Sequence, residues 1–401
     1  MRPDSRPVRL AAAILFLAVS GSAAARLWGP FAAAWIARGE AADPAVYQRA
    51  LRRDPANPDY HFTAAEIYHL SARHQDSRRA LAHYEEAVRG NPDRSAHWLG
   101  LSKLLEALGD APGARRAMAK AIETDPHYAR THWAAANLYL RLGDLDAADA
   151  ALARTADLDA GFLDQILDLV WRYYQDPARI VTTYVPDTKA GNLAALRYFI
   201  LRESEDGSRL AWNRLGAFPT AARERLAYVE YLIGLGEPHR AYDVFLRDAD
   251  RPAVFNGGFE DELLNGGFDW RFPTRGPAAV RRDATRSDEG RSSLMIEFDG
   301  EENPNFSGVW HWLPVEAGTR YELSFRMRTE EVSTDQGVYV EVDGETSDPI
   351  LGTTPWRERA IRFTASSDLV RVRVRRDATR KFDNRLRGRV WLDDFRLVAP
   401  E

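Results

Sequence analysis

The sequence predicts a multidomain chain in which an all-α helical repeat array is followed by an all-β sandwich. Apolar residues recur with a helical period from about residue 43 to 250, and one pattern of small residues, glycine and proline returns every ~34 residues. After residue 252 the period changes to two, with glycine and asparagine between the alternating segments. We therefore expect a targeting segment at 1–25, helical repeats at 26–252 and a β-sandwich at 253–401.

Length and composition limit the classes of function. The 401 residues leave room for two or three domains, and a formal net charge of -5 gives no basic field for a nucleic-acid partner. The chain has no cysteine, which excludes disulfides, thiolate metal sites and a cysteine nucleophile. Arginine supplies nearly all of the 54 basic residues, which together with abundant alanine is typical of a GC-rich bacterial genome.

The N-terminus carries a targeting pattern. Three arginines precede an apolar run at 10–19, which small residues follow at 20–25, as in a secretory signal. The run is short for a membrane-spanning helix, which needs about 20 apolar residues, but the chain is apolar again at 27–37. A cleaved signal and an uncleaved membrane anchor both stay open, and each predicts an exported bacterial envelope protein that is periplasmic, anchored in the inner membrane or secreted. The alternative to both is a buried helix in a cytosolic protein.

The clearest repeat unit lies at 95–128. Gly109 allows a tight turn between two helices, Ala114 is small where the helices cross, and Pro126 ends the second helix. This unit resembles the tetratricopeptide repeat. The same frame fits 58–92 and 129–160, and weaker units continue to about residue 250.

The resemblance to tetratricopeptide repeats implies a groove that binds a protein partner. By the register of the family, the groove residues are Glu66, His69, Lys103, Glu106, Trp133, Asn137 and Arg141. Some such proteins clamp a partner's terminal carboxylate with lysine and asparagine, but Trp133 stands where the lysine would be needed, so we do not expect the clamp. The alternative is a spacer whose groove is merely solvated.

The C-terminal region alternates in the manner of half-buried strands. Valines and arginines alternate at 370–375, and apolar and polar residues alternate at 321–328. Further short strands are expected at 337–342, 359–364 and 389–398. Antiparallel strands at this spacing, with no helices between them, favour a two-sheet sandwich.

Four motifs in this region resemble those of carbohydrate-binding modules of the family 4/9 type. In chain order they are 256–260 (NGGFE), 290–294 (GRSSL), 315–321 (VEAGTRY) and 391–395 (WLDDF). The resemblance implies a jelly-roll sandwich over about 254–399 and a polysaccharide ligand. The same fold also serves as an inert or protein-contacting module.

Aromatic residues on outward strand faces are the expected sugar-binding platform, because sugar rings pack on aromatic planes. Alternation directs Trp310, Trp312, Tyr339 and Glu341 outward, and we expect Trp356 and Trp270 to form walls beside them. The alternative is that these tryptophans form an interface with the helical domain. The outward arginines Arg326, Arg328, Arg371, Arg373 and Arg375 would suit an anionic polysaccharide, or else form a solvated stripe.

Members of this family often hold a structural calcium ion near the first and last strands. By that resemblance Glu260 and Asp393 or Asp394 are the candidate ligands. Calcium takes six to eight oxygens, and the sequence offers two or three. The alternative is a set of carboxylates that hydrogen-bond turns or strands.

No pattern in the sequence indicates catalysis or another cofactor. We find no phosphate-binding loop, nucleophile elbow or metalloprotease helix, and the paired carboxylates are adjacent residues rather than groups facing across a cleft. Two hypotheses remain. One is a non-enzymatic envelope adaptor that binds protein through its repeats and glycan through its sandwich, by analogy in exopolysaccharide or O-antigen production and export. The other is a pure protein–protein scaffold whose sandwich binds no sugar.

Overall fold

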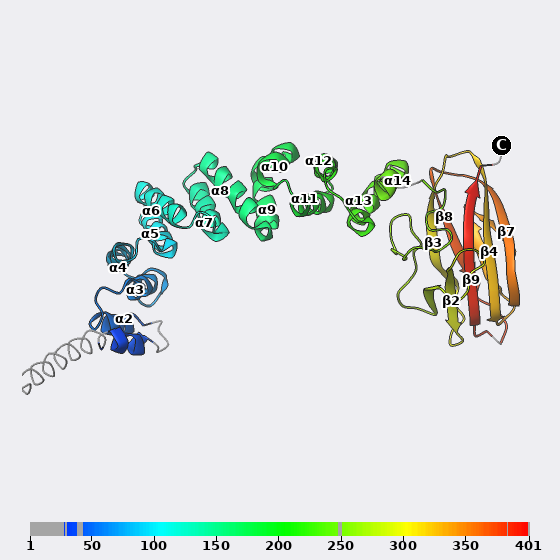
Figure 1. The fold of residues 1–401 in the computed structure, drawn as a ribbon, viewed down its shortest axis with the longest axis horizontal. Helices are drawn as coiled ribbons and strands as arrows, with labels where there is room; N and C mark the ends of the chain where they lie inside the picture. Colours follow the sequence, from blue (N-terminus) through cyan, green and yellow to red (C-terminus); the bar gives the residue numbers. More distant parts are fainter. Residues whose placement is uncertain (1–27, 29, 38–42, 248–250, 383, 400–401) are drawn as a thin grey trace, which may run out of the picture. The chain divides into compact units, whose positions relative to one another are not determined.

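The computed structural model describes residues 28, 30–37, 43–247, 251–382 and 384–399 (Figure 1). The predicted signal or anchor at 1–25 lies outside these residues. Within the described ranges, no helix combines the length and the apolar character that crossing a membrane requires. The chain divides into two compact units, Met1–Ala194 and Ala195–Glu401, so the last helices and the sandwich share one unit.

The first unit is built of antiparallel helix pairs, α3 with α4, α5 with α6, and α7 with α8. Its helices are α2 (Pro44–Leu51), α3 (Pro58–Leu70), α4 (Ser77–Gly90), α5 (Ser95–Ala107), α6 (Ala111–Thr124), α7 (Ala129–Arg141), α8 (Leu145–Leu158), η1 (Ala160–Phe162), α9 (Leu163–Tyr174) and α10 (Pro177–Tyr184). The turns within the second and third pairs place Gly109 and Gly143 at φ 81° and 71°, a conformation that other residues adopt only with strain. The aspartate after each of these glycines caps the helix that follows.

The repeat period returns in the packing. Ala80, Ala114 and Ala148 occupy equivalent places in successive helix pairs, and each is fully buried. A larger residue there would separate the two helices of its pair. Tyr84 of α4 packs closely against α5 of the next helix pair, because a methyl group on Gly100 would lie 2.5 Å from its ring. The tetratricopeptide-type array predicted from the sequence is therefore the observed arrangement.

The second unit begins within α11 and contains the sandwich. Its helices are α11 (Lys189–Leu201), α12 (Glu205–Leu215), α13 (Ala222–Gly234) and α14 (Pro238–Leu246). Its strands are β1 (Ala278–Asp283), β2 (Ser293–Asp299), β3 (Phe306–Pro314), β4 (Arg320–Val332), β5 (Tyr339–Val342), β6 (Glu345–Thr346), β7 (Gly352–Thr364), β8 (Leu369–Arg376) and β9 (Arg387–Val398). A five-stranded sheet in the order β1-β2-β9-β4-β7 packs on a four-stranded sheet in the order β3-β8-β5-β6, and all pairs are antiparallel.

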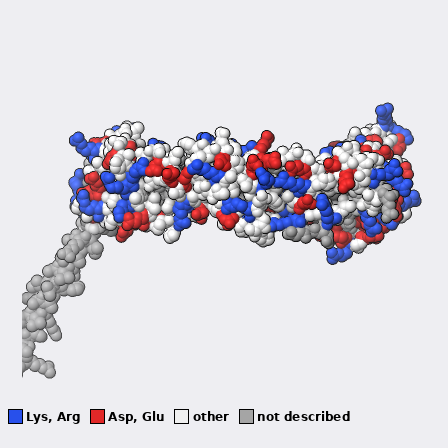
Figure 2. All heavy atoms as spheres, turned by 90° about the horizontal axis from the view of Figure 1, so that it is seen from above, with Lys and Arg blue, Asp and Glu red and all other residues white. Residues whose placement is uncertain are grey.

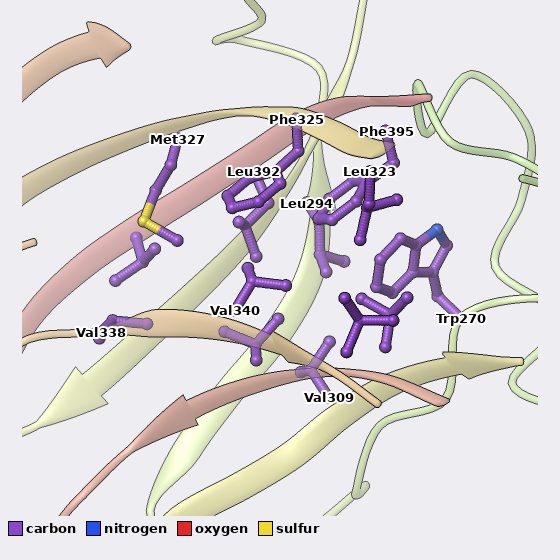
Figure 3. Close-up of a cluster of buried hydrophobic side chains, with 14 of the residues drawn as sticks. Trp270, Leu294, Val309, Leu323, Phe325, Met327, Val338, Val340, Leu392 and Phe395 are labelled. Carbon is purple, nitrogen blue, oxygen red and sulfur yellow. The ribbon is translucent and has the colours of Figure 1, made fainter. Parts of the chain in front are cut away.

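The core of the sandwich lies between the two sheets. Figure 3 shows inward side chains from both, including Val309, Val338 and Val340 of the smaller sheet region facing Leu323 and Leu392 of the larger. All five are fully buried. Burial of this apolar surface is the main favourable term in holding the sheets together.

Aromatic contacts join the last helix to the first loop of the sandwich. Phe245 of α14 packs against Phe255 and Phe268, with ring centroids 4.8 and 5.8 Å apart. Tyr242 lies 4.8 Å from Phe268, edge to face. Phe245 and Phe268 are fully buried, so this cluster is a continuous core between helix and loop.

A carboxylate on α13 adds polar contacts to the same junction. The Glu230 Oε1 atom accepts the backbone N–H of Gly267 at 2.8 Å and binds the Arg271 guanidinium at 2.5 Å. Arg271 then pairs its backbone with Trp310 of β3, through bonds of 2.8 and 3.0 Å. One glutamate therefore ties a helix to the loop that borders the four-stranded sheet.

The first two of the four motifs in the sandwich interlock. The Glu260 Oε1 atom accepts the backbone N–H groups of Arg291 and Ser292 at 2.7 and 3.0 Å. Gly290, at φ 63°, lets the chain approach, because a methyl group there would lie 2.4 Å from the same oxygen. These N–H bonds keep the pKa of Glu260 below its usual value.

Candidate binding sites

The predicted groove residues lie together on the first helices of three successive pairs. Glu66 and His69 come from α3, Lys103 and Glu106 from α5, and Trp133, Asn137 and Arg141 from α7. These helices are neighbours, since α3 contacts α5 and α5 contacts α7. The last five of the seven residues line one pocket of about 220 Å³, together with Ser102, Met118, Ala134 and Leu138.

One of the two basic side chains in the pocket, Arg141, has an ion-pair partner, and Lys103 has none among the described residues. Arg141 binds Glu106 with two N–H groups, one of which gives an Nη2–Oε2 distance of 2.8 Å. Lys103 is exposed and forms no ion pair with any described residue, although its charge acts on Glu66 and His69. Burial raises the pKa of Glu66, and burial together with Lys103 lowers the pKa of His69. Lys103 is therefore a cation without an ion-pair partner among the described residues, and it lines the same pocket as Trp133.

Two groove residues are held by their neighbours. The Asn137 side-chain amide donates to the backbone oxygen of Trp133 at 2.8 Å, so one of its donors is occupied within α7. Trp133 packs on Phe162 of η1 with a centroid distance of 5.6 Å. The indole is thereby fixed at the border of the pocket without being buried.

A second candidate site is the outer face of the β3-β8-β5-β6 sheet. Along β3, Val309 and Leu313 are fully buried, whereas Trp310 and Trp312 are half-buried on the opposite face. Tyr339 and Glu341 lie on the same outer face of β5, and alternate arginines of β8 lie between the two strands.

Glu341 neutralises two of these arginines. Its carboxylate binds Arg373 at 3.3 Å and also binds Arg375. Arg375 lies 3.7 Å from Asp377, which accepts the hydroxyl of Tyr339 at 3.0 Å. Glu341 and Tyr339 are therefore committed to contacts within the sheet face.

The two tryptophans contact guanidinium groups. Arg371 lies 4.6 Å from the ring centroid of Trp310 and 4.5 Å from that of Trp312. Arg271 lies 4.6 Å from Trp310, and the two indoles meet edge to face at 5.3 Å. These distances are those of cation–π contacts. Among the described residues, the ring of Trp310 contacts two guanidinium groups and that of Trp312 contacts one.

The two expected walls are not part of this face. The expectation for Trp270 is wrong, because its side chain is fully buried among Phe259 and Phe395 at 5.1 and 4.6 Å (Figure 3). Its indole N–H donates to the backbone oxygen of Asn256 at 3.2 Å, so its polar atom is satisfied inside the sandwich. Trp356 lies on β7, an edge strand of the other sheet, and the structure does not bring it to Trp310 and Trp312.

The candidate calcium ligands serve the fold. Glu260 holds the loop before β2, and the Asp393 Oδ2 atom accepts the backbone N–H groups of Asp288 and Glu289 at 2.8 and 3.2 Å. The Asp394 carboxylate binds Arg396 at 2.7 Å. Within the ranges that the structure describes, no three acidic, histidine or cysteine side chains form a group that could hold a metal ion. N–H donors already surround these carboxylates, so the arrangement does not fit calcium.

Sequence reasoning missed Arg271, and it placed Arg371 on the outer sheet face without predicting its contacts with the tryptophans. Arg271 reaches Trp310 from a loop, and no strand alternation applies to a loop. The stacking of Arg371 on both tryptophans follows from the pairing of β3 with β8, in which Trp310 is opposite Arg373 and Trp312 is opposite Arg371. That register depends on which strands are neighbours, which the sequence pattern does not specify.

Charge over the rest of the surface is mixed. Figure 2 shows basic and acidic side chains interspersed on the face in view. This distribution agrees with the small net charge of -5. Binding by charge must therefore depend on local arrangements such as those at Lys103 and Arg371.

Comparison with known proteins supports the reading of the helical part. Residues 105–170 match the tetratricopeptide repeat family model. This match covers α6 to α8 and most of α9, so the sequence-based recognition of the repeat is confirmed there. No curated protein sequence matches the chain.

Several solved structures are similar to parts of this chain. The crystal structure of MamA is 14% identical and covers 43% of this chain and 83% of that one, with a TM-score of 0.28. The TmCBM61 structure in complex with β-1,4-galactotriose is 18% identical and covers 38% of this chain and all of that one (100%), with a TM-score of 0.28. The CBM22-1 xylan-binding domain of Paenibacillus barcinonensis Xyn10C is 17% identical and covers 35% and 90%, with a TM-score of 0.25. The chain's own elements show a helical repeat array followed by an antiparallel sandwich, as the sequence predicts.

Proposed function

We propose that this protein is a non-enzymatic adaptor that binds a protein segment in its repeat groove and a glycan on the outer face of its four-stranded sheet. The observation that carries the proposal is the convergence of Lys103, Trp133 and Asn137 on one pocket from two neighbouring first helices. Such a pocket offers a charge, an aromatic surface and a hydrogen-bonding amide to one extended segment.

The free cation indicates the chemistry of that segment. Lys103 has no ion-pair partner among the described residues, while the other basic side chain of the pocket, Arg141, is bound to Glu106. An acidic side chain or a terminal carboxylate would complete the charge balance at Lys103. The indole of Trp133 would contact an apolar residue next to that acid.

Peptide display against the full chain tests the groove. We expect enriched peptides to share an acidic group beside an apolar residue, and to lose binding at least tenfold with Lys103→Glu. Lys120→Glu is the matched control, because Lys120 is an exposed lysine of α6 outside the pocket and pairs with the nearby Glu123. Peptides that bind both variants equally, or no enrichment at all, would contradict a groove function.

The glycan half of the proposal depends on the half-buried Trp310 and Trp312. Large aromatic side chains on an outward sheet face are suited to contact the C–H faces of sugar rings. A glycan array probed with the full chain is the direct test, with Trp312→Ala as the variant. Absence of any glycan signal from folded protein would favour the second hypothesis, a protein–protein scaffold.

The place of action is part of the same proposal. The charged, apolar and small residues at the N-terminus support export to the bacterial envelope, with cleavage and anchoring both open. A polysaccharide ligand there would agree with a role in exopolysaccharide or O-antigen production or export. Fractionation of cells that express the full chain, with mass spectrometry of its N-terminus, distinguishes a periplasmic, anchored or secreted product from a cytoplasmic one.

A further inference from the structure

We propose that the outer face of the β3-β8-β5-β6 sheet binds a polysaccharide that carries carboxylates, with the guanidinium of Arg371 as the anion-binding group and Trp312 as the adjoining sugar contact. This inference rests on the proposed glycan function and names the class of glycan. It concerns a cluster defined by Arg371, Trp312, Trp310 and Arg271, called the arginine–tryptophan cluster below.

Arg371 differs from the other outward arginines of β8. Arg373 and Arg375 share the carboxylate of Glu341. The guanidinium of Arg371 forms no hydrogen bond or ion pair with any residue in the described ranges, and its Nε atom is buried without a partner. A half-buried cation without an anion is costly, so a ligand that supplies one gains that energy.

The missing partner has a structural reason. Continuing the β5–β8 register beyond Val342 would place Asp343 opposite Arg371. However, β5 ends there, and Asp343 takes a left-handed conformation at φ 48°. Its two carboxylate oxygens instead accept the backbone N–H and the hydroxyl of Ser366, at 2.7 and 2.6 Å. The carboxylate that would neutralise Arg371 is thereby used to fix a turn.

The residues around Arg371 hold its guanidinium in a fixed position on the sheet face. Burial, together with the charges of Arg373 and Arg271, lowers the pKa of Arg371. The two indoles hold the guanidinium plane in place at 4.6 and 4.5 Å. A guanidinium fixed in this way can give two parallel N–H bonds to one carboxylate.

The tryptophans favour a sugar acid over an acidic peptide. A uronic acid residue carries a carboxylate on a ring whose C–H face is apolar, and the Arg371–Trp312 pair offers a fork for the first and an aromatic surface for the second. Trp312 contacts only one guanidinium among the described residues, whereas Trp310 contacts Arg371 and Arg271. Trp312 is therefore the ring that we assign to the sugar.

The test uses the full chain on matched pairs of neutral and uronate-containing polysaccharides at low and high salt. We expect binding to polyuronates, at least tenfold weaker with Arg371→Gln and weakened by salt. Arg371→Lys should restore part of the binding, because it keeps the charge but loses the fork. Arg362→Gln is the control, since Arg362 is an exposed arginine of β7 that pairs with Glu322.

The other outcomes distinguish failure of the carboxylate preference from failure of glycan binding itself. Binding of neutral glycans alone, lost with Trp312→Ala, would overturn the inference and leave the glycan function standing. Poly-glutamate that binds through Arg371 as tightly as the polyuronates would show that the cluster recognises an acidic peptide. That result would overturn the assignment of a saccharide ligand. No binding by folded protein, confirmed by circular dichroism for each variant, would overturn both.

Discussion

His311 offers a sharp test of how the sandwich is packed. It lies on β3 between the two outward tryptophans and is 1% exposed. Its Nε2 atom is 3.1 Å from the backbone oxygen of Phe255, and its ring is 4.9 Å from that of Trp270. Because a carbonyl oxygen can only accept, Nε2 carries a proton. Nδ1 is buried without a partner among the described residues, so burial favours the neutral imidazole.

The sign and size of the pH effect follow from this burial. Burial lowers the pKa of His311 from 6.5 to about 4. Between these values the unfolded chain binds a proton that the folded chain does not, so stability is fully present above pH 6.5 and is lost as the pH falls towards 4. The difference between the two pKa values corresponds to a loss of about 3 kcal/mol over that range.

A second buried group acts in the opposite sense. Desolvation raises the pKa of Asp393 from 3.8 to about 6, so this carboxyl destabilises the fold as the pH rises through that range. The pH profile of the unmodified protein therefore mixes two trends. The His311→Gln variant separates them, because its amide can donate to Phe255 and does not titrate.

The assay is amide hydrogen exchange of the full chain, followed for peptides from β3 and β4 at pH 7, 6, 5 and 4.5 and corrected for intrinsic exchange rates. We expect the stability difference between the unmodified protein and His311→Gln to shrink by roughly 2–3 kcal/mol as the pH falls. A difference that stays constant across this range would refute a neutral, fully buried His311.

Three further predictions concern stability. Trp270→Ala should cost about 3–5 kcal/mol of unfolding free energy, measured by denaturant titration, because it empties the core; a loss below about 1 kcal/mol would contradict its burial. Gly267→Ala should cost roughly 1–3 kcal/mol in the same assay, since it puts a methyl group at φ 60° within 2.8 Å of a phenylalanine of α14. Glu260→Ala should leave the sandwich folded but speed hydrogen exchange at Arg291 and Ser292, whereas unchanged exchange would show that the carboxylate does not hold that loop.

Sequence reasoning worked best where a period fixes the direction of a side chain. Alternation along β3 separated Val309 from Trp310, and the resemblance to tetratricopeptide repeats implied one groove for Lys103 and Asn137, which line one pocket although they lie on different helices. In each case neighbouring residues constrain one another, so a few apolar positions determine the direction of the rest.

It failed where a side chain sits outside such a period. Trp270 follows a glycine-rich loop, and only the three-dimensional path of that loop brings its indole to Asn256. Arg376 shows a second limit, this time within a strand. The alternation along β8 turns Arg375 outward and Arg376 into the sandwich, but it does not say what the buried guanidinium would bind. There its guanidinium donates to Asn303 and to other atoms of distant loops, which no local pattern could reveal.

The junction between α14 and the sandwich has a consequence for how this protein can be divided and recombined. The rings of Phe255 and Phe268 are covered by Phe245 and Tyr242, and Glu230 supplies bonds to Gly267 and Arg271. A cut at residue 253 would leave those rings bare and Arg271 without its counter-ion. The smallest piece that can be transplanted to another protein intact is therefore the sandwich together with its last helix pair, and recombination within this chain would be expected to preserve that pair with the sheets it supports.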